Sequence, residues 1–184
     1  MHQFPLPFLL LMSVTLAVSV KNQVYTDLKE VNLAILGGTA GATSVWSNRE
    51  DHNVDKAFVV DPKIGWCSEN MRNGPTQTIW KQFKQPVKLF KITFQGRRDV
   101  NLDEPTRFDI IGSNNEDCSQ DNWVTLATDD SGDEMSIQDK KTIRIPAGMT
   151  RYFTCYGIRV RDVRVRSNSD KFACISHIKF YMDS

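Results

Sequence analysis

Short stretches in which apolar and polar residues alternate recur along the chain. Residues 87–94 alternate over most of their length, and residues 141–145 do the same before Pro146. A period of two is typical of a β-strand that buries one face. Turn-forming Gly, Pro, Asn and Ser residues separate these stretches from further predicted strands at residues 107–113, 123–127, 156–161 and 175–181. Many short strands joined by turns, with almost no amphipathic helix, predict an antiparallel sandwich or barrel.

The first 19 residues have the pattern of a secretory signal. The apolar run at 8–18 is too short to cross a bilayer as a helix, and Ala-Val-Ser at 17–19 is a small-x-small cleavage site. No Lys or Arg precedes the run, and a buried helix is the alternative. We expect a secreted mature protein that starts near residue 20, with a short leader at 20–31 and one domain at 32–184.

Four cysteines occur in the 184 residues. An even number in an exported chain predicts two disulfides. A zinc site is the alternative, but the chain has no Cys-x-x-Cys pair and its three histidines are scattered.

Charge is segregated along the chain although the net charge is only +1. Residues 99–139 hold twelve acidic residues and one basic residue, whereas residues 140–171 hold nine basic residues and two acidic ones. We expect the two blocks to interleave on the folded sheet and neutralise each other, and an interaction patch is the alternative. An exported chain of nearly zero net charge argues against nucleic-acid binding.

Six segments of the chain resemble, in order and spacing, the discoidin domain, which is also called the coagulation-factor C-type domain. They are Val31–Ala34 with Thr43–Ser47, Ala57–Ser68, Trp80–Phe83 with Pro86–Val87, Ile92–Asp99, Phe108–Asn114 with Trp123, and Cys174–Tyr181. The resemblance implies an all-β, galactose-binding-like jelly roll of eight antiparallel strands, with a five-stranded sheet packed on a three-stranded sheet. It also implies ligand-binding loops at one end, and non-catalytic recognition of sugars, phospholipid head groups or proteins outside the cell.

The same resemblance implies a disulfide pairing. In the fucose-binding branch of the family, the cysteine after the Trp-containing segment bonds to the one that opens the last strand. Here Cys67 would bond to Cys174, which leaves Cys118 to bond to Cys155. This is one of three connectivities that four cysteines allow.

Calcium is not expected at the place where the family often holds it. Val59 and Ile64 stand where the family has Asp and Thr, and His177 stands where its last strand commonly has Glu. Only Asp61 and Ser68 keep a suitable side chain, whereas calcium needs about six to eight oxygen ligands. We therefore expect no cofactor, with weak coordination by backbone carbonyls as the alternative.

The sugar contacts of the fucose-binding branch are retained only in part. That branch uses a His, then Arg-x-Asp, then a basic residue. Arg97, Arg98 and Asp99 match the second element, but Asn70 stands at the His position and Glu104 at the basic one. The arginines could donate to sugar hydroxyls, and a salt bridge to a nearby aspartate is their structural alternative.

The loop at 45–56 supplies the other candidate ligand contacts. Trp46 could stack on a sugar ring, and core packing is the alternative for it. Asn48, Arg49 and His52 add polar groups to the same loop. The loop is polar and partly acidic, which argues against insertion into an anionic membrane.

We therefore expect a secreted recognition module that binds a cell-surface or matrix glycan, or a glycoprotein, without calcium. The loops at 45–56, 69–76 and 96–104 would form the site. A protein–protein adhesion or assembly module is the alternative, and binding of phospholipid head groups is a third. The chain contains neither Gly-x-Ser-x-Gly nor His-Glu-x-x-His, so no enzyme is predicted.

Overall fold

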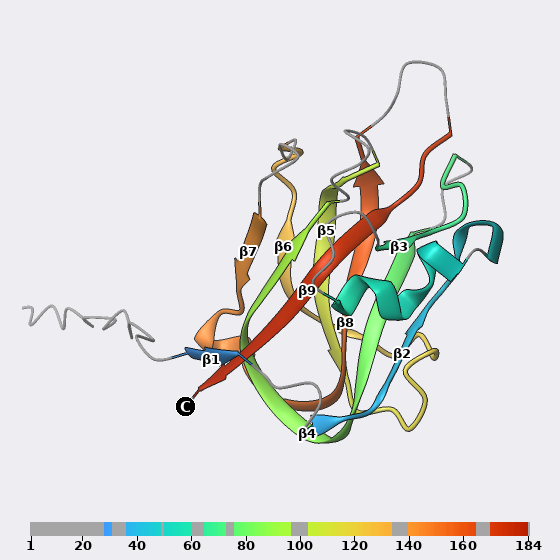
Figure 1. Cartoon of the computed structure of the whole chain (residues 1–184). Helices are drawn as coiled ribbons and strands as arrows, with labels where there is room; N and C mark the ends of the chain where they lie inside the picture. The colour runs from blue at the N-terminus through green and yellow to red at the C-terminus, as the bar shows by residue number, and fades with distance from the viewer. Residues whose placement is uncertain are drawn as a thin grey trace, which may run out of the picture.

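The computed structural model describes residues 28–30, 36–48, 50–59, 65–72, 76–96, 103–133, 140–164 and 170–183. The predicted signal segment lies outside these ranges. The strands form one connected antiparallel array of nine strands, which folds into two layers because one long strand belongs to both (Figure 1). We call these layers the first and second sheets. The first sheet contains β2 (Thr39–Ala42), the first half of β4 (Gln77–Gln95), β8 (Tyr152–Val163), β5 (Pro105–Ser113) and β6 (Val124–Asp129). The second contains β7 (Lys140–Arg144), the second half of β4, β9 (Cys174–Asp183) and β1 (Leu28–Glu30).

The predicted antiparallel, all-β fold is thus confirmed, and the first sheet has five strands as expected. The described residues contain nine strands, and two of them are short strands that pair with the ends of β9. One is β1, which pairs with the end of β9 although its residues belong to the predicted leader. The other is β3 (Trp66–Cys67), which pairs with the start of β9.

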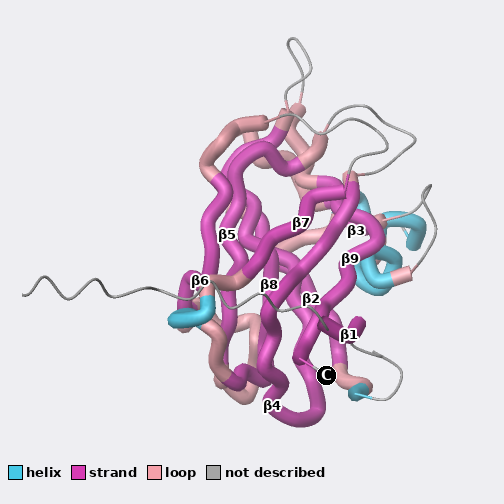
Figure 2. Tube along the Cα trace, turned by 90° about the vertical axis from the view of Figure 1, so that its left-hand side faces the viewer, coloured by secondary structure: helices cyan, strands magenta, loops and turns pink. Residues whose placement is uncertain are grey.

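Four short 3-10 helices complete the described elements, namely η1 (Trp46–Asn48), η2 (Glu50–His52), η3 (Val54–Phe58) and η4 (Ala147–Met149). Helices η1, η2 and η3 follow β2 in the chain. Both η2 and η3 contact β3, and η3 also contacts β9, as the cyan segments beside these two strands in Figure 2 show. The Asn53 side chain caps η3 by accepting a hydrogen bond from the Val54 N–H at 2.6 Å. Among the described residues, no helix is long and apolar enough to cross a membrane.

Strand β4 passes from one sheet to the other and bends at the foot of the view in Figure 1. The alternation in the sequence predicted a strand at residues 87–94, but the structure has one continuous strand from Gln77 to Gln95. The register with β8 shifts between Gln82 and Val87, and Pro86 is exposed within that irregular stretch. A proline is tolerated there because a bulge removes the need for its missing N–H.

Tyr156 on β8 secures this bend. Its buried hydroxyl accepts a hydrogen bond from the Leu89 N–H at 3.2 Å. The same hydroxyl lies 3.0 Å from the Val87 carbonyl oxygen and 2.9 Å from that of Arg151, so its proton has two acceptors. Burial raises the pKa of Tyr156 to about 12, against the smaller lowering effect of backbone hydrogen bonds.

The core lies between the two sheets and follows the alternation seen in the sequence. Ile92 and Phe94 of β4 and Phe108 and Ile110 of β5 are fully buried. The rings of Phe94 and Phe108 meet edge to face, with centroids 5.0 Å apart. Trp66 is also fully buried.

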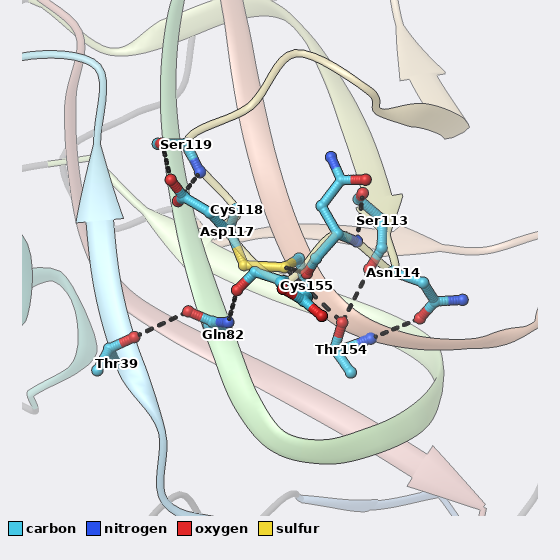
Figure 3. Close-up of a disulfide and its surroundings, with 11 residues drawn as sticks. Thr39, Gln82, Ser113, Asn114, Asp117, Cys118, Ser119, Thr154 and Cys155 are labelled. Carbon is cyan, nitrogen blue, oxygen red and sulfur yellow. Dashed lines mark hydrogen bonds between the residues drawn. A yellow bond between two sulfur atoms is a disulfide. The ribbon is translucent and has the colours of Figure 1, made fainter.

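Two disulfides join the pairs that the resemblance implies. Cys67–Cys174 links β3 to β9, and Cys118–Cys155 links the loop after β5 to β8. Figure 3 shows the Cys118–Cys155 disulfide and the hydrogen bonds around it. There Gln82 donates to the Glu116 carbonyl oxygen at 2.7 Å.

The acidic and basic blocks of the sequence interleave across β5, β6 and β8, as predicted. Arg161 lies 3.3 Å from Asp109 and 2.6 Å from Asp130, and Arg159 lies 3.1 Å from Asp121. The same block supplies Asp129, which lies 3.2 Å from the Lys141 ammonium. The basic side chains of β8 are thereby neutralised.

Candidate functional site

Several described segments that flank the predicted binding loops meet at one end of the sandwich, the upper end in Figure 1. Gln95 near the end of β4 pairs with Ser176 of β9, and Pro105 at the start of β5 pairs with Val163 at the end of β8. The Cys174 N–H donates to the Asp103 carbonyl oxygen at 2.8 Å. Of the predicted site residues, Arg49, Asp61, Arg97, Arg98 and Asp99 lie outside the described residues.

A polar network anchors the segment that leads to Trp46. The side-chain oxygen of buried Gln77 accepts hydrogen bonds from Thr43 Oγ1 at 2.7 Å and from Ser44 Oγ at 2.6 Å. Ser44 Oγ in turn accepts a hydrogen bond from the Glu69 N–H at 2.9 Å. The loop with Trp46 and the loop after β3 are therefore tied to the same strand, which limits their movement.

Trp46 lies in η1 with its side chain partly exposed. Its ring centroid is 4.7 Å from that of His52 and 5.6 Å from that of Phe172, which is also partly exposed. Neither alternative from the sequence holds fully, because the ring is both packed and accessible. Asn48 ends the same helix.

The burial of His52 contradicts the prediction that this residue contacts a ligand. Its side chain is only 2% exposed, since it lies against Trp46 in the interior of the molecule. A buried imidazole supports the tryptophan ring and is not presented to a ligand at the surface. The polar composition of its loop gave no sign of this burial.

Asn70 is exposed, but its side chain joins two loops. Nδ2 donates to Asp170 Oδ1 at 2.7 Å, and Oδ1 accepts hydrogen bonds from the N–H groups of Arg72 at 2.9 Å and Lys171 at 3.2 Å. The Met71 N–H adds a backbone bond to the Lys171 carbonyl oxygen. Asn70 therefore positions the loop before β9, and little of its hydrogen-bonding capacity remains for a ligand.

The loop before β9 supplies two site residues that the sequence did not suggest. Phe172 packs against Trp46, and Asp170 is exposed beside Asn70. Their signal was an aromatic and an acidic residue just before Cys174, but nothing in the local pattern placed Phe172 against Trp46. Their proximity depends on the pairing of β3 with β9.

Ser68, the second weak calcium candidate, is fully buried, and its hydroxyl is engaged by backbone groups. Oγ donates to the Glu69 carbonyl oxygen at 2.8 Å and accepts from the Ala173 N–H at 2.9 Å. Within the described ranges, no group of three or more His, Cys, Asp or Glu side chains is placed to hold a metal ion.

Glu104, at the position expected for a basic sugar contact, is 1% exposed and lies beneath this end of the sandwich. Its neighbour Asp103 is also buried and has a left-handed backbone conformation, with φ of 78°. Across the sheet, His177 Nδ1 lies 3.2 Å from Gln95 Oε1. These residues therefore form a polar layer beneath this end of the sandwich.

No protein-family profile and no curated protein matches the chain. Solved structures do match. The F5/8 type C domain of a Bacteroides fragilis protein superposes with a TM-score of 0.66 and 11% identity, over 86% of this chain and 99% of that domain. The fold is the galactose-binding-like jelly roll of the discoidin domains.

Two sugar complexes share the jelly roll. A family 32 carbohydrate-binding module from C. perfringens NanJ, solved with galactose, has a TM-score of 0.59 and 18% identity over 78% of this chain and 92% of that one. Another C. perfringens module, solved with GalNAc-β-1,3-galactose, has a TM-score of 0.56 and 15% identity over 77% and 93% of the two chains.

Proposed function

We propose that this protein is a secreted, non-catalytic carbohydrate-binding module. It binds a cell-surface or matrix glycan through the loops at the Trp46 end of the jelly roll, without calcium. The observation that carries the proposal is the partly exposed Trp46 ring, which His52 and Phe172 hold in place. Sugar sites combine such an aromatic platform with a few fixed polar groups.

Asp170 is an exposed polar group in the described part of the site. Its Oδ1 accepts a hydrogen bond from Asn70, which orients the exposed carboxylate. The second carboxylate oxygen makes no hydrogen bond to the described residues and can accept one from a sugar hydroxyl. A charged acceptor of this kind forms a stronger hydrogen bond than a neutral one does.

A glycan array with and without EDTA tests the proposal, followed by titration of the best glycan by calorimetry. Trp46→Ala and Asp170→Ala should each weaken binding about tenfold, which corresponds to the loss of about 1.4 kcal/mol. Tyr152→Ala is the matched control because Tyr152, 65% exposed, is an aromatic residue on β8 outside this site. EDTA should leave binding unchanged.

Unchanged affinity in both site variants would rule out this binding surface, and loss of binding in EDTA would rule out calcium independence. Thermal unfolding of each variant separates a lost contact from a lost fold, because Trp46 also packs against its neighbours.

A protein–protein adhesion module is the second candidate. It is favoured by the engagement of Asn70 with Asp170 and by the burial of Glu104, because both stand where sugar contacts were expected. Silence on the array, together with capture of one defined cell-surface protein that Trp46→Ala abolishes, would select this function.

A further inference from the structure

The outward side of the second sheet carries a group of positive charges that the candidate sugar site does not use. We call it the basic face and define it by Lys140 and Arg144 of β7, Lys91 of β4 and Lys179 of β9. Strand register brings these residues together: Lys91 pairs directly with Arg144 on one side and with Tyr181 on the other.

The neighbours of Lys91 along β4 show which way this face points. Ile92 and Phe94 are fully buried in the core, so Lys91 and Thr93 point away from it. Thr93 pairs with Thr142 on β7 and with Lys179 on β9, which extends the same face by one row. Thr93 is only 2% exposed, so the hydroxyl available among the cations is that of exposed Thr142.

Few carboxylates oppose these charges. Arg144 and Lys140 are exposed and make no ion pair with the described residues. Lys91 Nζ lies 3.6 Å from the centre of the Tyr181 ring, which leaves its charge unneutralised. Glu30, 2.8 Å from Lys179, supplies the one carboxylate among the side chains described on this face.

The described carboxylates of the acidic block that form ion pairs do so with cations outside the basic face. Asp109 and Asp130 face Arg161, and Asp129 faces Lys141. Among the described residues, Lys91, Lys140 and Arg144 of the second sheet therefore lack the ion pairs that neutralise Arg159 and Arg161 of the first. A local excess of one charge sign attracts a partner of the opposite sign over about one Debye length, roughly 8 Å at physiological ionic strength.

We propose that the basic face binds a sulfated polysaccharide. Strand spacing and rise give it a size on the order of 10 by 13 Å, enough for a few anionic groups of a linear chain. Sulfate oxygens accept hydrogen bonds from ammonium, guanidinium and hydroxyl groups, all of which occur on this face. The proposal uses no residue of the Trp46 end and does not rest on the glycan site proposed there.

An anionic membrane is a poorer partner for this surface. The large apolar side chains that are exposed among the described residues are Val59, Val124 and Tyr152, and they lie on η3's C-cap, β6 and β8. None belongs to the strands of the basic face, so its described residues include no exposed large apolar side chain to insert between lipids.

The test is the affinity of the full mature protein for immobilised heparin between about 0.05 and 0.5 M NaCl, where screening weakens exposed charges. The double variant Lys91→Gln/Arg144→Gln should raise Kd about tenfold or more at 0.15 M NaCl. The matched control Lys84→Gln/Arg107→Gln removes two exposed positive charges from strands of the first sheet and should stay within about twofold.

Trp46→Ala should bind heparin as the unaltered protein does, which separates this site from the proposed glycan site. Equal loss in the two double variants would overturn the proposal, because binding would then follow net charge alone. Absence of binding at the lowest salt would overturn it as well. The proposal would also be overturned if the protein bound phosphatidylserine vesicles or polyglutamate more tightly than heparin and this binding depended equally on Lys91 and Arg144.

Discussion

Tyr156→Phe removes the hydroxyl that secures the bend of β4. The Leu89 N–H loses its acceptor, and the carbonyl oxygens of Val87 and Arg151 lose a donor. The benzene ring stays, so its edge-to-face contact with Phe153, at 5.6 Å between centroids, is retained. A buried amide left without a partner costs about 1–3 kcal/mol, and we expect the free energy of unfolding at pH 8 to fall by about 2 kcal/mol.

The pH dependence of this loss is a sharper test. Burial raises the pKa of Tyr156 to about 12 in the folded protein, compared with its ordinary value of 10.0. The folded state thus holds the phenol proton more tightly, and the stability linked to it is complete below pH 10 and is lost as the pH rises toward 12. By pH 11 the loss amounts to about 1.4 kcal/mol.

Phenylalanine cannot ionise, so the variant does not suffer this loss. The difference in stability between the two proteins should shrink by about 1.4 kcal/mol between pH 8 and pH 11. Denaturant unfolding followed by tryptophan fluorescence, with disulfides intact, measures it at each pH. Lysine titration affects both proteins equally. A difference that stays constant over this range would refute the reasoning.

Three further changes have definite expected outcomes. Thr93→Val should raise the free energy of unfolding by up to about 1 kcal/mol, because the buried Thr93 hydroxyl has no hydrogen-bond partner among the described residues. A lower denaturant midpoint for the variant than for the unaltered protein would contradict this. Replacing Cys67 and Cys174 together by Ser opens a loop with a sequence separation of 107 and should cost about 4–5 kcal/mol, read from urea unfolding of the two proteins. Asn70→Asp sets two carboxylates against each other at Asp170, so we expect a loss of about 1 kcal/mol at pH 7 that recovers near pH 3, and a pH-independent loss would argue against the contact.

Most strands could be predicted because each has a local period. The alternation at 87–94 becomes the second half of β4, and that at 141–145 becomes β7. Side chains that alternate between core and solvent reveal a strand whatever its partner is. The disulfide pairing was accessible only through the resemblance, because spacing alone allows three connectivities.

The continuity of β4 could not be predicted from local sequence, since Pro86 normally ends a strand. It persists because the strand leaves one sheet there and enters the other, where Tyr156 compensates the irregular backbone. The burial of His52 escaped prediction for a similar reason: whether a loop histidine is covered depends on what lies above it, and here that is Trp46.

The sequence by itself determined the class of fold and the number of disulfides, and it suggested Trp46 for the candidate site. These follow from alternation, cysteine count and residue type, which are local properties. Only the tertiary structure decided which distant residues meet. Phe172 reaches Trp46 through the pairing of β3 with β9, and Lys91 meets Arg144 through the pairing of β4 with β7. Sheet register determines such neighbours, and register depends on the packing of the whole core.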